Sequence, residues 1–193
     1  MFHTRYDGFV FKSFTGRDCD DTLASCGSGS ELAELVFAQR DATFTGAEIG
    51  AEVDIGRVHR GVWGVSGQYD FVRASFDDHV NVPRIPPHRV GAGLYYRDPA
   101  WAARVFTLTA FRQDDVSSID ARDTPTNGYT LLNAELAYTF KTRDDGNLAS
   151  SMTIGLKAEN LLDDDVRNHV SFKKDEVLQP GRTFRLFGSI KFN

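Results

Sequence analysis

Apolar and polar residues alternate along most of the chain, and this two-residue period constrains the fold more than any other feature. In the closing stretch GRTFRLFGSIKFN every second residue belongs to a mostly apolar set, which consists of Phe184, Leu186, Gly188, Ile190 and Phe192. The residues between them are mostly polar. Successive side chains of a β-strand point to opposite faces, so this stretch predicts a strand with one apolar face. Because no segment keeps a helical period over more than two turns, the sequence predicts an all-β protein.

The same period recurs in seven other segments, which predicts an antiparallel meander of eight long strands. The predicted strands are residues 2–13, 36–55, 61–75, 88–97, 102–113, 129–140, 150–161 and 181–192. Their connections alternate between long polar loops and short turns, and the short turns are residues 56–61, 98–101 and 141–147. One end of the sheet is therefore expected to carry tight turns and the other end large loops, as in outer-membrane barrels.

Alternation alone leaves open which face contacts water. In a soluble β-sandwich the apolar face packs into a core, whereas in a membrane barrel it faces lipid. The predicted strands have about ten residues or more, which exceeds the usual five or six of soluble sheets and matches a tilted crossing of the hydrocarbon layer. Strand length favours the membrane barrel, and the sandwich stays as an alternative.

Composition and motifs argue against several other classes of protein. The formal net charge of −5, without a basic cluster, argues against nucleic acid as a partner. The opening MFHTRYDGFVFK lacks a basic segment followed by an apolar one, so it is not read as a signal peptide. We expect no enzymatic activity, because the sequence has no GxSxG, HExxH, CxxC or phosphate-binding loop.

The two cysteines, Cys19 and Cys26, are separated by six residues. This spacing permits a small disulfide loop in an oxidising compartment, and two unpaired thiols in a cytosolic loop are the alternative. A zinc knuckle would need two further ligands, and only Asp18, Asp20 and Asp21 lie nearby. We expect the disulfide if the protein is exported.

Three stretches carry motifs that occur together, in this order, in one family of receptors. They are RDATFTGAEIGAEVDIG (40–56), GLKAENLLDDDVRNH (155–169) and PGRTFRLFGSIKF (180–192). Together they resemble the C-terminal barrel region of TonB-dependent outer-membrane receptors, whose 22-stranded barrels hold an N-terminal plug. The resemblance implies that residues 1–193 form the last part of such a barrel in the outer membrane of a Gram-negative bacterium, without the plug, the energy-coupling box and the export signal.

The resemblance also implies a function and partners. Such a receptor imports a metal or a metal chelate, with zinc, haem or a siderophore as the ligand and no covalently bound cofactor. The stretches NHVSFKKDEVLQPGR and VFAQRDATFTGAE are most similar to the branch associated with zinc and haem. The implied partners are outer-membrane lipid, the barrel assembly machinery, the plug with the upstream strands, and the inner-membrane energy-coupling complex.

An autonomous eight-stranded outer-membrane barrel with a structural or adhesive role is the competing interpretation. The interior of such a barrel is narrow and must be filled by side chains. The inward positions here include Gly50, Gly91, Gly93 and Gly155, together with charges that have no evident partner in the sequence. Both features favour a wide lumen over a filled one.

Candidate site residues fall into three groups. Imidazole and carboxylate groups can ligate zinc, and the loop candidates are Asp77, Asp78, His79 and His169, which are otherwise ordinary solvated residues. The residues expected to face the lumen, where the family contacts its plug, are Glu48, Glu52, Asp54, Glu135, Lys157, Glu159, Arg185 and Lys191. A merely hydrated wall is the alternative for them. Phe192 matches the C-terminal signal that the assembly machinery reads, although Asn193 follows it.

Overall fold

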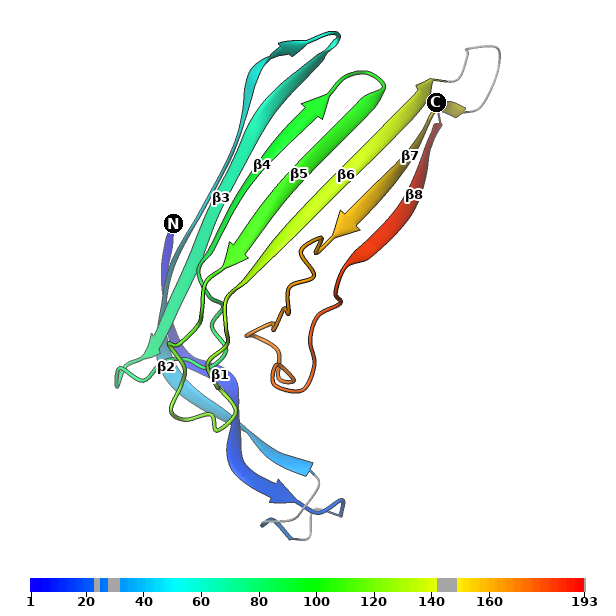
Figure 1. The fold of residues 1–193 in the computed structure, drawn as a ribbon. Helices are drawn as coiled ribbons and strands as arrows, with labels where there is room; N and C mark the ends of the chain where they lie inside the picture. Colours follow the sequence, from blue (N-terminus) through cyan, green and yellow to red (C-terminus); the bar gives the residue numbers. More distant parts are fainter. Residues whose placement is uncertain (23–24, 28–31, 142–148, 193) are drawn as a thin grey trace.

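A computed structural model describes residues 1–22, 25–27, 32–141 and 149–192. Its strands are β1 (Phe2–Cys19), β2 (Leu32–Val58), β3 (Gly61–Phe76), β4 (Arg89–Arg97), β5 (Trp101–Ala110), β6 (Tyr129–Lys141), β7 (Ala149–Glu159) and β8 (Thr183–Phe192). They form one antiparallel sheet in the order β1 to β8 (Figure 1), which confirms the predicted meander. The described part of the chain contains no helix whose length and apolar character suit a membrane crossing.

The first hairpin is longer than the sequence predicts. β1 was expected to end at residue 13 and continues to Cys19, while β2 begins at Leu32 instead of residue 36. Pairing between the two strands shifts register twice, between Tyr6 and Phe9 and again between Phe14 and Asp18. Each bulge contains a glycine with positive φ, Gly8 (72°) and Gly16 (83°). A bulge resets the two-residue period, so the continuation of the strand was hidden from the pattern.

The sheet has two unlike ends (Figure 1). Short turns join β2 to β3 and β4 to β5 at one end, while residues 77–88, 111–128 and 160–182 form long connections at the other. The β1–β2 hairpin projects past the other strands at the long-loop end. The third predicted short turn, at 141–147, lies almost wholly outside the described residues.

One face of the sheet is apolar and exposed. A single register row crosses seven strands and consists of Val53, Val65, Leu94, Val105, Ala134, Ala158 and Phe184. Leu94, Phe184 and Leu186 have 59%, 62% and 78% of their surface exposed. Burying one such side chain stabilises a protein by roughly 1.5–3 kcal/mol. A face of this extent in water would be very unfavourable, and no second sheet among the described residues covers it, which overturns the sandwich alternative.

The buried core is small and lies on the opposite face, under the long connections. Its members are Phe11, Ala42, Ala74, Phe76 and Val82, with Val80, Ile85 and Ile119 packed against them. Ala42 alternates in phase with Glu48, so the core continues the polar face of β2 toward the loop end. Loop residues therefore fold over the polar face of the sheet at this end.

Candidate functional site

Most of the inward charges pair with charges on other strands of the sheet. Glu135, Lys157 and Arg185 stand opposite one another on β6, β7 and β8. Lys157 Nζ lies 3.2 Å from Glu135 Oε2, and Arg185 donates to Glu159 Oε2 at 2.9 Å. Arg104 on β5 donates to Glu52 Oε1 at 2.8 Å, across β3 and β4.

Asp54 is held by two groups of β4. The Tyr95 hydroxyl donates to it at 2.6 Å and the Arg97 guanidinium at 2.8 Å. Glu48 has no ion pair among the described residues, and Lys191 continues the same face near the end of β8. The partners of the paired charges lie up to 52 residues away in the chain, so no partner was evident from the sequence alone. The ion pairs are about half exposed, so each contributes only ~0–1 kcal/mol.

Aromatic rings cover several of the inward glycines. A Cβ atom at Gly93 would lie 2.7 Å from the Phe106 ring, and one at Gly155 would lie 2.3 Å from the Phe187 ring. The Phe106 ring also approaches Gly91. These glycines therefore leave room for rings from adjacent strands, which corrects the expectation that they line an open lumen. Gly50 differs from the other three, because the nearest atom to a Cβ there would be the Gly67 carbonyl oxygen at 4.0 Å.

Two long connections meet through a buried charge network. Asp123, in the 111–128 connection, faces Lys174 and His169 of the 160–182 connection. Lys174 Nζ lies 3.1 Å from Asp123 Oδ1, and His169 Nε2 lies 3.4 Å from the same oxygen. All three side chains are at most 1% exposed. Such burial is rare for charged residues and requires that they be paired.

The surroundings of Asp123 strongly favour its ionised form. The backbone N–H of Ser117 donates to Oδ2 at 2.8 Å, and Thr126 Oγ1 lies 3.0 Å from His169 Nδ1. Burial raises the pKa of Asp123, but His169, the Ser117 amide and Lys174 outweigh it and lower the pKa from 3.8 to about 2. Asp123 is therefore a carboxylate at any physiological pH.

A third connection joins the same network through Arg84. Its guanidinium donates to Asp120 Oδ2 at 3.1 Å and to the Ser171 carbonyl at 3.0 Å, and it stacks 4.3 Å from the Phe172 ring. Arg84 and Asp120 are both buried. The loop cluster, which we define as Arg84, Asp120, Asp123, His169 and Lys174, thus ties the three long connections into one unit. Of these five residues only His169 was a candidate from the sequence, because the partners share no period and lie far apart in the chain.

The structure does not bring the four predicted metal ligands together. The Asp77 carboxylate pairs with Arg5 at 3.0 Å, and Asp78 pairs with Arg40. His79 is exposed in a turn with positive φ (64°). His169 lies in the loop cluster, buried between Thr126 and Asp123.

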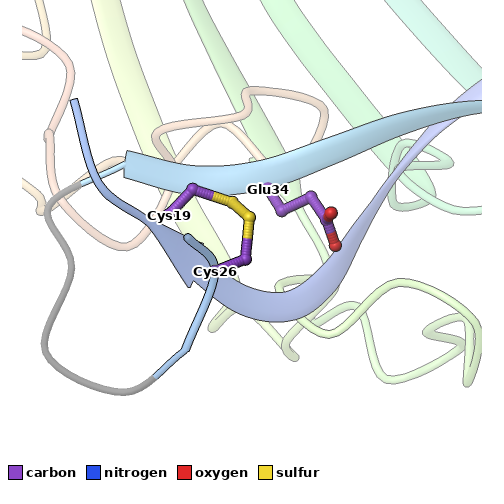
Figure 2. A group of neighbouring side chains, drawn as sticks. All are labelled: Cys19, Cys26 and Glu34. Carbon is purple, nitrogen blue, oxygen red and sulfur yellow. A yellow bond between two sulfur atoms is a disulfide. The ribbon is translucent and has the colours of Figure 1, made fainter. Parts of the chain in front are cut away.

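Among the described residues, one group of three potential ligands lies within 4.8 Å, namely Cys19, Cys26 and Glu34 (Figure 2). Cys19 and Cys26 form a disulfide at the tip of the β1–β2 hairpin, so neither sulfur is a thiolate. Glu34 accepts hydrogen bonds from Arg17 at 2.7 and 2.9 Å and a further one from Thr15. Because Arg17 neutralises the Glu34 carboxylate and the cysteines are joined to each other, this group is poorly suited to bind a cation. Its contacts instead hold the two strands of the hairpin together.

Comparison with known proteins places the sheet in a family. The model of TonB dependent receptor-like β-barrels matches residues 1–161. This chain belongs to the TonB-dependent receptor β-barrel family. The receptor chain also resembles the solved structure "Copper transporter OprC", with a TM-score of 0.69 and 21% sequence identity. At this identity the likeness shows the fold.

The receptor chain corresponds to only part of that transporter. The match covers 98% of this chain and 28% of the transporter, so the chain spans less than a third of its length. A search of curated proteins found no match.

Proposed function

We propose that this chain forms the C-terminal strands of an outer-membrane TonB-dependent receptor that imports a metal ion or a metal chelate. The observation that carries the proposal is a single curved sheet with an exposed apolar face and an ion-paired polar face. Such a sheet fits a wall between lipid and a hydrated lumen. The family match supports the same assignment.

The open sheet argues against the autonomous eight-stranded barrel. Among the described residues β1 pairs only with β2, and β8 pairs only with β7. A closed barrel of eight strands would pair β1 with β8. Unpaired edges in lipid would leave rows of N–H and C=O groups without partners, which is costly. Both edges are therefore proposed to pair with upstream strands of a larger barrel.

The partners follow from this placement. The polar face, including Glu48, Glu52, Asp54 and Glu135, is proposed to contact the plug. Phe192 is proposed as the residue that the barrel assembly machinery reads, and the inner-membrane energy-coupling complex drives import through the intact receptor. The long connections then lie at the outer surface, where the ligand arrives.

The ligand is proposed to be a metal, free or chelated. The zinc and haem branch is suggested by the sequence resemblance, and copper is suggested by the name of the transporter with a similar fold. His169 is proposed to take no part in coordination, because its ring is buried between Thr126 and Asp123. Ligands from the rest of the receptor are therefore expected to complete any metal site.

Uptake measurements test this function. Cells that carry the natural full-length gene, and cells in which it is deleted, are supplied with radiolabelled zinc, copper or iron-haem. We expect one ligand to accumulate only when the gene is present, and the accumulation to stop when inner-membrane energy coupling is abolished. Equal accumulation of all three ligands in both strains would refute metal import by this protein.

A further inference from the structure

A polar groove opens beside β3 at the end of the sheet that carries the long connections. This outer groove has a volume of about 380 Å³. Thr43 and Thr45 of β2 and Arg73 and Ser75 of β3 line its sheet side, and Asp115 lines it from the 111–128 connection. Strand β4 begins at Arg89, which pairs with Asp70, so β3 beyond Asp70 is flanked by the long connections instead of by a strand.

The groove lies on the apolar side of the sheet. Arg73 stands opposite Thr45, and Tyr69 stands opposite Ile49 of the apolar face. Because side chains two residues apart share a face, Arg73 follows Tyr69 and Phe71 on that side. The groove is therefore not part of the lumen wall.

Along β3, the groove also lies at the level where the apolar face of the sheet gives way to polar residues. Tyr69 and Phe71 form an aromatic group with His88, whose ring stacks 5.2 Å from Phe71 and whose Nδ1 lies 2.9 Å from the Tyr69 hydroxyl. Such groups mark the boundary between hydrocarbon and headgroups. Arg73 is the next residue outward on the same face, about 7 Å beyond Phe71. If the sheet spans the membrane, its guanidinium lies among the lipid phosphates.

Arg73 is exposed, and its side chain has no ion pair or hydrogen bond among the described residues. Its neighbours at the same end differ, since Arg5 pairs with Asp77 and Arg40 pairs with Asp78. An arginine that a fold leaves unpaired beside a polar groove is available to an external anion.

The groove supplies further donors beside that arginine. The hydroxyls of Thr43 and Ser75 face the same hollow. A guanidinium flanked by hydroxyls matches the tetrahedral oxygens of a phosphate group. Asp115 disfavours an anion on the loop side, which leaves the Arg73 side as the place for it.

We propose that the outer groove binds the phosphate group of an outer-leaflet lipid, with Arg73 as its principal contact. The inference rests on the proposed function, because the membrane position fixes the height of the groove. It commits to a lipid phosphate, since the groove opens beside the lipid-facing surface and away from the lumen.

The test uses the natural full-length protein purified from outer membranes in detergent. Retained lipopolysaccharide, whose lipid anchor carries phosphates, is quantified by mass spectrometry for wild type, Arg73→Gln and Arg57→Gln. Arg57 is an exposed arginine at the opposite end of β2, so its variant removes the same charge at the other side of the membrane. We expect Arg73→Gln to retain about three- to tenfold less lipid per protein, as for the loss of one charge-assisted contact, and Arg57→Gln to match wild type.

Equal retention by wild type and Arg73→Gln would overturn the proposal. Complete displacement of the lipid by millimolar inorganic phosphate would also overturn it, because the groove would then be a site for free phosphate. Failure of the underlying function is seen separately: wild-type protein would be absent from the outer-membrane fraction. Its presence there, with no effect of Arg73→Gln, would leave the receptor assignment intact and remove only the lipid site.

Discussion

Replacing Asp123 by Asn tests whether the loop cluster holds the long connections together. Among the residues that the structure describes, Asp123 is the only carboxylate within ion-pair distance of Lys174 Nζ and His169 Nε2, both of which are buried, and the substitution removes its charge. Removing one member of a buried ion pair costs ~3–5 kcal/mol, because the remaining charge stays without a partner. The lowering of the Asp123 pKa from 3.8 to about 2 corresponds to ~2–3 kcal/mol at neutral pH, which is the same order.

Hydrogen exchange measures this cost locally, in the natural protein in detergent. When reclosing is fast, amide exchange reports the free energy of local opening. A loss of ~3 kcal/mol should speed exchange in residues 111–128 and 160–182 by about a hundredfold. The amides of β6, outside the cluster, should keep their wild-type rates.

Asp114→Asn is the matched control, since it changes the same chemical group in the same connection. Asp114 pairs with Arg112 at 2.7 Å, but both side chains are 60% exposed, and such pairs contribute ~0–1 kcal/mol. Its exchange should change by less than about fivefold. If Asp123→Asn exchanges no faster than Asp114→Asn, the cluster does not hold the loops, and the argument from burial is wrong.

Four further predictions follow from the described contacts. The depressed pKa of Asp123 means that its carboxylate stabilises the folded loops fully above pH 3.8 and loses that contribution as the pH falls to about 2. Hydrogen exchange in the loops of the wild type, corrected for intrinsic rates, should therefore be constant from pH 5 to 8 and should rise near pH 2–3. Glu52→Gln, which breaks the exposed pair with Arg104, should lower the free energy of unfolding by less than about 1 kcal/mol in a denaturant titration, and a larger loss would contradict the exposure argument. Replacing both Cys19 and Cys26 by Ser should destabilise the hairpin tip by about 2 kcal/mol, seen as faster proteolysis near the tip with unchanged β4–β6 exchange. The 193-residue chain expressed alone should aggregate or require detergent, and a monodisperse monomer in plain buffer would refute the membrane assignment.

The fold was predictable because its signal is repeated in every strand. The alternation of apolar and polar residues from Val90 to Tyr96, and from Leu132 to Phe140, fits a strand and does not fit a helix. The short connections then determine which strands are neighbours. The prediction failed where the period itself was interrupted, at the bulges beside Gly8 and Gly16. A local shift of one residue hides the rest of a strand from a pattern that depends on phase.

The candidate site was less predictable, because its contacts depend on tertiary structure. Lys174 in an acidic, polar loop is expected to be solvated, yet the folded connections bury it against Asp123, 51 residues earlier in the chain. Asp77 and Asp78 were plausible ligands in the sequence, and the fold commits them to Arg5 and Arg40. The type of a residue indicates which ligands its side chain could bind, whereas its partners in the fold determine whether the side chain is still free to bind them.

The order of the strands also has a kinetic consequence. Because each strand pairs with the next one in the chain, every hairpin can close as soon as its two strands are present, and the sheet can grow by serial addition. The loop cluster is the exception, since Arg84, Asp123 and Lys174 come from three separate connections. Its closure must wait until the connection that precedes β8 has been placed. Burial of Lys174 is therefore a late event, and a probe at that position would report when this part of the wall has been completed.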